Sequence, residues 1–150
     1  MENHTYKVSV TWLHDREGWG EGPGIREAVK FSAPPDFGGR PGLWSPESLL
    51  VLAANSCFTS TLLHLAESSG LALAGYRAEA KGQVERVQGQ GYRFTEIVLQ
   101  PEVILADADQ TELAQKLLAL AQRLCIVASS LRIPVRVEAG VEVATPAPNG

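Results

Sequence analysis

The feature that most constrains the fold is a long apolar segment between Ser45 and Gly70. Ser45, Pro46 and Glu47 form a helix start: a serine oxygen accepts from unpaired amides, proline fits the first helical position, and a carboxylate suits the positive end of the helix dipole. Glycine is a typical helix terminator. We therefore predict a helix over residues 46–69, which at 1.5 Å per residue is roughly 36 Å long, about the width of a small domain.

Apolar side chains in this segment cover more than one stripe, and most of the other positions hold small residues. The large apolar residues are Leu49, Leu50, Leu52, Phe58, Leu62, Leu63 and Leu65. This pattern predicts a helix that is buried nearly all round. One sheet of a 150-residue chain cannot comfortably cover so much apolar surface, so we expect a homodimer whose subunits share the helix.

The residues before the helix indicate two strands and a long loop. Apolar residues at alternate positions predict a strand at residues 5–13 with one buried face. They are Tyr6, Val8, Val10 and Trp12. Residues 14–24 are rich in glycine and are expected to form a loop, after which alternation resumes in residues 25–31. The prolines and glycines of residues 33–43 exclude regular structure, and compact domains usually keep such long loops for function.

After the helix, the pattern predicts a hairpin, a second helix and a last strand. The hairpin comprises residues 76–87 and 92–105, and its alternation slips between Phe94 and Ile97, where we expect a bulge. A helix over residues 109–124 follows, with Asp109 and Glu112 as a variant of the capping box. Alternating apolar residues over 133–143 predict the last strand.

The order of these elements favours an α+β fold, in which an antiparallel sheet packs against helices, over alternating βαβ units. A length of 150 residues and a hydrophobic content of 45% are typical of one globular domain. We expect a single domain over residues 1–143, followed by a flexible tail at 144–150.

Charge and composition exclude several functions. The 13 basic and 17 acidic residues give a net charge of −4, which disfavours nucleic acid as a partner. No unbroken apolar run approaches the ~20 residues that span a bilayer, so no membrane span is expected. The polar N-terminus lacks the features of a signal peptide, which indicates a cytoplasmic protein. Its two cysteines are then reduced at rest, and a transient redox role is open to them.

Cys57 and Cys125 are the candidate chemical groups. Free cysteine often packs as a small hydrophobe, so a structural role is the alternative for each. A reactive thiol needs a lowered pKa. Cys57 is expected in the middle of a helix, without a helix N-terminus nearby, in apolar surroundings that would raise its pKa. An arginine brought to it would counter this effect, and the candidates are Arg16, Arg26 and Arg40.

Glu47 is the candidate to orient that arginine. Ten residues separate Glu47 from Cys57, which is about 15 Å along a straight helix. One chain therefore cannot bring the two side chains together, and a site that uses both needs two subunits. Antiparallel packing of the helix against its symmetry mate would bring Glu47 of one chain towards Cys57 of the other.

Other chemistries find little support in the sequence. His4, His14 and His64 form no ligand cluster. Cys57 and His64 are about 10.5 Å apart along the helix, which excludes a dyad between them. The glycines of residues 18–24 are followed by neither a Lys-Ser/Thr pair nor a helix start, so they form no phosphate loop.

The chain resembles the OsmC/Ohr family of thiol-dependent peroxidases. Five segments carry the resemblance, spread over roughly residues 6–143. They are Asp-Phe-Gly-Gly at 36–39, Ser-Pro-Glu-Ser-Leu-Leu at 45–50, Ala-Asn-Ser-Cys-Phe at 54–58, Phe-Thr-Glu-Ile at 94–97 and Leu-Cys-Ile-Val at 124–127. A Pro-Glu-x-Leu element and a Cys-Phe element on one helix, with a second cysteine after the next long helix, are specific in combination.

The resemblance implies an intertwined homodimer with antiparallel sheet around paired central helices. It implies that Cys57 is the peroxidatic cysteine, Cys125 the resolving cysteine, and Glu47 the carboxylate that holds an activating arginine, for which we favour Arg40. Its substrates would be organic hydroperoxides. No metal or bound cofactor is implied, and a dithiol such as a lipoyl group or a small thiol would be the reductant.

Two other functions remain compatible with the residues. The first is a non-catalytic dimer that binds a small apolar ligand, with both cysteines as buried structural residues. The second is an acyl thioester hydrolase, which needs a general base for which the sequence offers no candidate.

Overall fold

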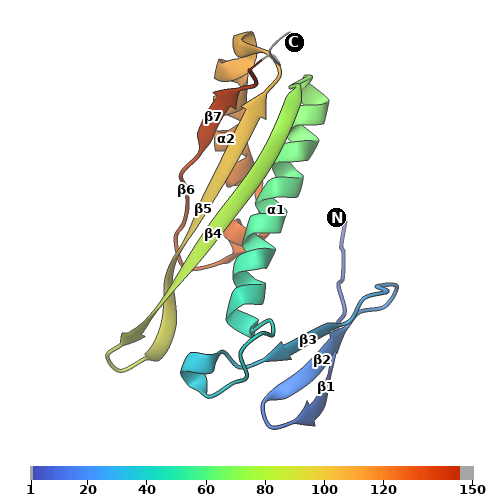
Figure 1. Ribbon diagram of the computed structural model, residues 1–150, viewed down its shortest axis with the longest axis vertical. Helices are drawn as coiled ribbons and strands as arrows, with labels where there is room; N and C mark the ends of the chain where they lie inside the picture. Colours follow the sequence, from blue (N-terminus) through green and yellow to red (C-terminus); the bar gives the residue numbers. More distant parts are fainter. Residues whose placement is uncertain (1, 146–150) are drawn as a thin grey trace, which may run out of the picture. The chain divides into compact units, whose positions relative to one another are not determined.

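The computed structural model describes residues 2–145 (Figure 1). The chain forms two compact units, Met1–Leu50 and Val51–Gly150, which are described in turn. The α+β class expected from the sequence is confirmed. A single domain over residues 1–143 stays a prediction, and residues 146–150 of the expected tail lie outside the described residues.

The first unit is a three-stranded antiparallel sheet in the order β1 (Ser9–His14), β2 (Glu17–Glu21), β3 (Val29–Ser32). The expectation of a loop over residues 14–24 was wrong, because β2 is the central strand. Its glycines hide the strand pattern, and packing requires one of them: a Cβ at Gly18 would lie 2.8 Å from Cζ of Phe31 on β3.

The expected buried face of the first strand was also wrong for the single chain. Tyr6, Val8, Val10 and Trp12 are 91%, 80%, 65% and 73% exposed. They share the alternation of a strand face, but no residue within 2–145 covers them. The alternating pattern thus reports a face suited to burial, without saying what buries it.

The long loop after β3 contains one short 3₁₀ helix, η1 (Pro35–Phe37). Gly38 follows it in the left-handed region at φ 80°, and a Cβ at Gly39 would overlap the Ala33 carbonyl. The buried hydroxyl of Ser32 accepts a hydrogen bond from the Arg40 backbone N–H at 2.9 Å. The loop therefore has a defined conformation, in which the backbone of Arg40 lies against Ser32 at the end of β3.

The second unit is built on a long hairpin, β4 (Leu73–Val87) and β5 (Gly91–Leu105), which confirms the predicted one. The expected bulge is present, because Gln83 pairs with Glu96 while Val84 pairs with Phe94. The last predicted strand is two short strands, β6 (Val135–Val137) and β7 (Gly140–Val143), and both run parallel to β5. The antiparallel pairing expected from the sequence is present in the β4–β5 hairpin, and the parallel β6 and β7 make this sheet mixed.

Helix α1 (Pro46–Ser69) has the predicted bounds. The second helix is preceded by η2 (Ala108–Gln110) and extends over α2 (Thr111–Leu124). The expected cap at Asp109 was wrong: the side chain of Asp107 accepts from the backbone N–H of Asp109 at 2.9 Å. A further short helix, α3 (Ile126–Ser130), follows Cys125 and was missed.

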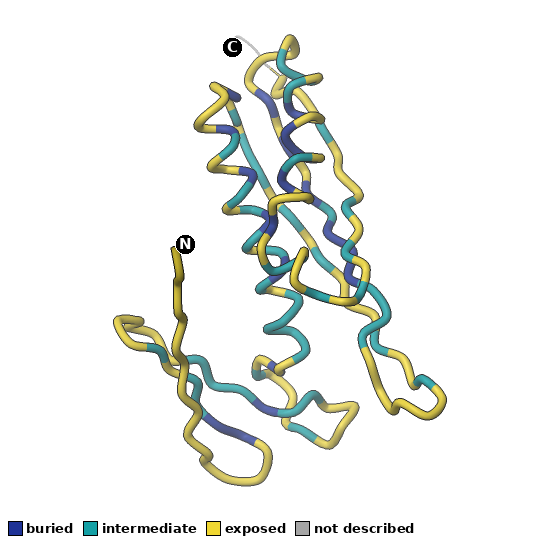
Figure 2. Tube along the Cα trace, turned by 180° about the vertical axis from the view of Figure 1, so that it is seen from behind, coloured by how far each residue is buried: buried dark blue, intermediate teal, exposed yellow. Residues whose placement is uncertain are grey.

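The core lies between the helices and one face of the sheet, as the buried segments of α1, α2 and β5 show (Figure 2). The core-cluster residues of α1 are spaced four apart, and those of β5 fall on one face of the strand. They are Ala54, Phe58, Leu62 and Ala66 on α1, and Ile97, Leu99, Val103 and Leu105 on β5. The expectation of a helix buried all round was wrong for the single chain, because Leu52 and Leu63 are 42% and 44% exposed.

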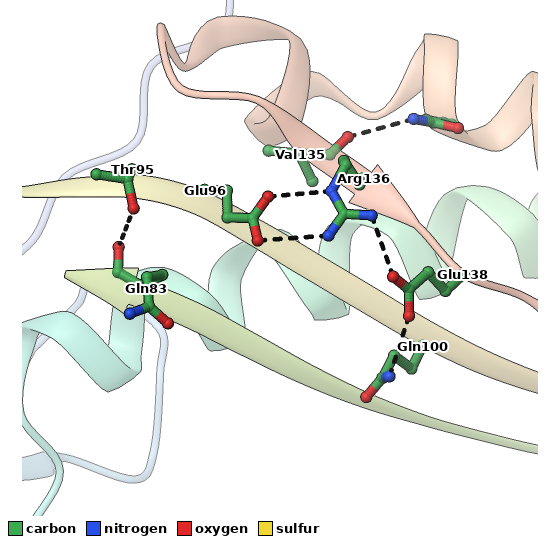
Figure 3. A network of polar contacts seen from close by, with 8 residues as sticks. Gln83, Thr95, Glu96, Gln100, Val135, Arg136 and Glu138 are labelled. Atoms are coloured by element: carbon green, nitrogen blue, oxygen red, sulfur yellow. Dashed lines mark hydrogen bonds and ion pairs between the residues drawn. The ribbon is translucent and has the colours of Figure 1, made fainter. Parts of the chain in front are cut away.

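The outer face of the sheet is polar. Arg136 of β6 donates two hydrogen bonds to Glu96 of β5 and one to Glu138, at 3.0–3.3 Å, and Glu138 also accepts from Gln100 (Figure 3). Hydrogen bonds from Arg136 lower the pKa of Glu96. This network joins β5 to β6 on the face that the helices leave open.

By length and composition alone, α1 could cross a membrane. The search for an unbroken apolar run did not foresee this, because small polar residues interrupt the apolar ones. The core helix of a globular protein passes the same test, and α1 carries the buried stripe of the second unit.

Candidate active site

Cys57 and Cys125 come together in the second unit. Cys57 lies in the middle of α1 and is partly exposed, whereas Cys125 is fully buried between α2 and α3. The two thiols lie close enough for each to shift the pKa of the other. Cys125 Sγ also lies 4.0 Å from the carbonyl oxygen of Ala54, one turn before Cys57. The sequence singled out both cysteines as candidates, but only the fold shows that they lie close together.

The chain places Cys125 there by ending α2 sharply. The backbone of Cys125 is extended, at φ −62° and ψ 110°, and α3 begins at the next residue. The expectation that Cys57 has no helix N-terminus nearby was therefore wrong, since the backbone of Val127 and Ile126 at the start of α3 lowers the pKa of Cys57. No capping serine, proline or glycine marks the start of α3, so the sequence gave no signal for it.

The two thiols have opposite pKa shifts. Burial raises the pKa of Cys57, but hydrogen bonds from Val127, Cys125, Ile126 and Thr61 outweigh it, and the pKa lies below its ordinary value. Burial is the largest cause for Cys125 too, and there the neighbouring Cys57 adds to it, so the pKa of Cys125 is raised. Of the two thiols, Cys57 is therefore the one that loses its proton more readily.

Polar residues of α1 surround Cys57. The hydroxyls of Thr61 and Ser60 donate to the Cys57 carbonyl at 2.8 and 3.1 Å. Asn55 donates to the Ala78 carbonyl of β4 at 3.1 Å, while its Oδ1 is buried with no hydrogen-bond partner among the described residues. An unpaired buried acceptor is uncommon. Of these side chains, Thr61 also acts on the thiol, where its hydrogen bond lowers the pKa of Cys57.

The predicted cation and its carboxylate lie in the first unit. Arg40 is 62% exposed in its side chain, and its Nη1 lies 3.6 Å from Oε1 of the buried Glu17. Arg16 donates to the carbonyl of Phe37, and Arg26 is exposed. Glu47 lies in the first turn of α1, and its Oε2 is buried without a hydrogen-bond partner among the described residues.

Glu17 is a residue that sequence reasoning missed. It is 5% exposed, and Lys30 Nζ and His14 Nδ1 lie within 3.9 and 3.7 Å of its carboxylate. A lone glutamate in a glycine-rich segment gives no sign of burial. The pairing in β2 with Ser32 of β3 is what turns it inward.

His14, Asp15 and Glu17 offer three ligand atoms within 4.8 Å of one another. The spacing of the three histidines along the chain gave no indication of this group. Lys30 and Arg40 already provide two positive charges beside Glu17. Because these charges repel a cation, we propose no metal at this cluster.

The fold and the cysteine pair together define an α+β protein with a two-thiol site. A family model described as OsmC-like protein matches residues 39–139, which include Glu47, Cys57 and Cys125. The chain therefore belongs to the OsmC-like family. Among curated proteins, it is 26% identical over 148 residues to the uncharacterized protein YmaD of Bacillus subtilis, a match that covers 95% of this chain and 98% of that one.

Solved structures share the fold. An OsmC-like protein of unknown function from Vibrio cholerae matches with a TM-score of 0.83 and 21% identity, covering 91% of this chain and 99% of that one. An organic hydroperoxide resistance protein OsmC from Legionella pneumophila matches with a TM-score of 0.74 and 22% identity, covering 95% and 100%. A third, a putative organic hydroperoxide resistance protein from Vibrio cholerae with captopril in one of its active sites, has a TM-score of 0.68 and 22% identity, covering 93% of each chain.

Proposed function

We propose that this protein is a thiol-dependent peroxidase that reduces organic hydroperoxides. The observation that carries the proposal is the contact between Cys57 and Cys125, with the pKa of Cys57 lowered and that of Cys125 raised. Membership of the OsmC-like family agrees with it. Solved structures with the same fold are named as organic hydroperoxide resistance proteins, which supports this class of substrate.

The reaction would take place in three steps. The Cys57 thiolate attacks the terminal oxygen of the hydroperoxide; the O–O bond breaks, Cys57 becomes a sulfenic acid, and the alkoxide leaves and takes a proton to form the alcohol. The Cys125 thiol then attacks the Cys57 sulfur, which forms a disulfide and releases water. A dithiol donor reduces this disulfide through a mixed disulfide and is itself oxidised.

Partial exposure suits Cys57 to the first step, because the peroxide must reach it. The complete burial of Cys125 protects it from direct oxidation and leaves Cys57 as its accessible partner. These roles agree with those that the resemblance implies. They require no metal or bound cofactor, and the donor is proposed as a lipoyl-type dithiol or a small thiol.

The proposal includes a homodimer in which Glu47 and Arg40 complete the site. The apolar face of residues 6–12 and the outer side of α1 are exposed in the single chain, which supports a second copy as their cover. The buried Oε2 of Glu47 has no donor among the described residues, and a guanidinium would supply one. Arg40 is held by Glu17 within its own unit, so its role towards Glu47 and Cys57 stays a prediction, as do Arg16 and Arg26 as alternatives.

Cys57→Ser tests the function directly. We expect the variant to lose the consumption of cumene hydroperoxide with dithiothreitol as donor, because a serine hydroxyl is not ionised at neutral pH. His64→Ala, an exposed substitution on the same helix, is the matched control and should keep wild-type rates. A serine variant as fast as the wild type would exclude the proposed reaction.

Cys125→Ser tests the second step. One equivalent of peroxide should still oxidise Cys57 in this variant, and mass spectrometry should then detect a sulfenic acid that persists. In the wild type the same treatment should give a Cys57–Cys125 disulfide. If peptide mapping finds no such disulfide in the wild type, Cys125 is not the resolving residue.

A second candidate function is supported by an apolar groove in the first unit. The groove has a volume of about 440 Å³ and is lined by residues that include Val8, Val10, Ile25, Phe31 and Leu49. A protein that binds an apolar ligand there would need no reactive thiol. Alkylation of Cys57 by iodoacetamide separates the two functions: labelling at pH 6–7 supports the enzyme, whereas a thiol inert below about pH 8.5 supports the binding protein.

A further inference from the structure

Two loops of the first unit enclose a polar pocket that the proposed reaction does not use. The pocket has a volume of about 590 Å³ and lies between the β1–β2 turn and the loop that follows β3. Its lining residues include Arg16, Glu17, Ser32, Gly39 and Arg40. All the residues that line it belong to the first unit, so it is described within that unit alone.

The walls of this pocket have a defined conformation. The β1–β2 turn holds Asp15 in the left-handed region at φ 46°, and the Asp15 carbonyl accepts from Trp12 Nε1 at 3.1 Å. Arg16 joins the turn to the second loop, because its guanidinium donates to the Phe37 carbonyl and its own carbonyl accepts from the Ala33 N–H at 3.3 Å. A site with such preformed walls needs little reordering to bind a ligand.

Positive charge exceeds negative charge around the pocket. Glu17 is 5% exposed and serves two cations, because Lys30 Nζ and Arg40 Nη1 lie 3.9 and 3.6 Å from its Oε1. Asp15 is the other acid, and its carboxylate lies 3.2 Å from the ring of the neighbouring histidine. Among residues 2–145, no carboxylate lies within ion-pair distance of Arg16. Three cations thus face two carboxylates, and one positive charge is left over.

The pocket also has more hydrogen-bond donors than its own acceptors use. The side chain of Arg40 is 62% exposed and pairs only with Glu17 among residues 2–145, which leaves most of its five N–H groups available. Arg16 uses one of its donors on the Phe37 carbonyl. The hydroxyl of Ser32 is buried and accepts from the Arg40 backbone N–H, so its own proton is a further donor. Each of these donors would be satisfied by an acceptor oxygen.

We propose that this pocket binds a small oxyanion, a carboxylate or a phosphate, on the guanidinium groups of Arg16 and Arg40. The oxyanion supplies the acceptor oxygens and neutralises the excess positive charge. Guanidinium groups bind carboxylates and phosphates through paired hydrogen bonds, which a lone ammonium does not offer. Glu17 does not oppose this binding, because its charge is already offset by Lys30 and Arg40. The inference goes beyond the proposed function, since neither thiol takes part in it.

Titration of the ¹⁵N-labelled full-length protein with sodium phosphate or sodium acetate tests the proposal. Sodium chloride at equal ionic strength controls for screening. The amide signals of Ser32, Gly39 and Arg40 should shift saturably with at least one oxyanion and not with chloride. Saturation with acetate identifies a carboxylate site, and saturation with phosphate alone identifies a phosphate site. If neither oxyanion saturates these signals, or if chloride reproduces the shifts, the proposal is wrong.

Arg40→Gln removes one of the two guanidinium groups at a largely exposed position. The variant should raise the dissociation constant of the oxyanion about tenfold, because hydrogen bonds to a charged ligand are lost. Arg26→Gln is the matched control: it makes the same change of charge at an exposed arginine of the same unit that does not line the pocket. Its dissociation constant should equal that of the wild type. Equal losses in the two variants would show that only net charge matters and would overturn the site.

The titration is also kept separate from the proposed function. Arg40 is the favoured partner of Cys57 in the proposed reaction, so binding is measured without hydroperoxide and is repeated in Cys57→Ser. Wild-type affinity in Cys57→Ser supports a site in the first unit, whereas loss of binding there would contradict it. If peroxidase activity depends on Cys57 but no oxyanion binds, the function stands and only this site is lost. If Cys57→Ser keeps peroxidase activity, the function is wrong and the titration still decides the site.

Discussion

Gly82 on β4 sets how closely α1 packs against the sheet. A Cβ at this position would lie 2.6 Å from Cγ2 of Val51 on α1 and 2.7 Å from Cε1 of Phe94 on β5. Both distances are far below van der Waals contact. Gly82→Ala should therefore destabilise the protein, although alanine in a strand interior normally gains about 0.5–1 kcal/mol over glycine.

The expected magnitude follows from these two opposing effects. Inserting a methyl group into a packed site costs roughly 1–3 kcal/mol, so the net loss in unfolding free energy is centred near about 1 kcal/mol and reaches about 2.5 kcal/mol at most. A loss of about 1–2.5 kcal/mol corresponds to a fall of roughly 2–10 °C in Tm for a chain of this length. Urea denaturation with an unchanged m-value is the assay. Gly75→Ala on the same strand is the control, because its nearest neighbour is the end of the Ile104 side chain at 3.3 Å.

A double-mutant cycle identifies the contact. Val51→Ala removes the nearest atom, so Gly82→Ala should cost about 1 kcal/mol less in that background than in the wild type. If Gly82→Ala is neutral or stabilising, the close approach of α1 to β4 is wrong. If the cost is the same in both backgrounds, the clash is not with Val51.

Three further predictions concern a helix cap, the apolar face and a buried tyrosine. Asp107→Ala should lower the unfolding free energy by about 1 kcal/mol in urea melts, and Asp109→Ala by much less, because Asp107 supplies the cap. Val10→Asp should convert the expected dimer to a monomer in sedimentation experiments, whereas Thr11→Asp on the opposite strand face should not; a monomeric wild type would refute the shared interface. Burial raises the pKa of Tyr76, which is hydrogen-bonded to Thr59. Its contribution to stability should therefore be complete below pH ~10 and lost above it, and Tyr76→Phe should remove this alkaline dependence.

The sequence predicted the fold correctly where residue type and hydrophobic periodicity indicated the same element. The bounds of α1 follow from Ser45, Pro46 and Gly70, and the bulge in β5 follows from the slip after Phe94. β2 could not be found in this way, because its glycines serve packing against Phe31 and lack the side chains that mark a strand. Burial was overestimated for residues 6–12, since alternation shows only that a face is apolar.

The candidate site was likewise predicted in part and missed in part. The residue types and their spacing singled out Cys57 and Cys125, but no sequence feature indicated α3, whose five residues lack a cap. The sequence-based prediction for the pKa of Cys57 therefore rested on α1 alone, where burial raises the pKa. The backbone of Ile126 and Val127 helps to reverse that prediction, and it lies about seventy residues away in the chain.

The two thiols share one low-dielectric site, and the differences between their surroundings fix which of them is ionised. Both are penalised by burial, but Cys125 is fully buried while Cys57 is partly exposed. A negative charge on Cys57 accepts the Cys125 S–H and opposes ionisation of Cys125. Because two adjacent thiolates repel each other, ionisation of one keeps the proton on the other. In the proposed reaction, the partly exposed sulfur of Cys57 would thus be the one that a hydroperoxide reaches, and the buried thiol of Cys125 would keep its proton until Cys57 has been oxidised.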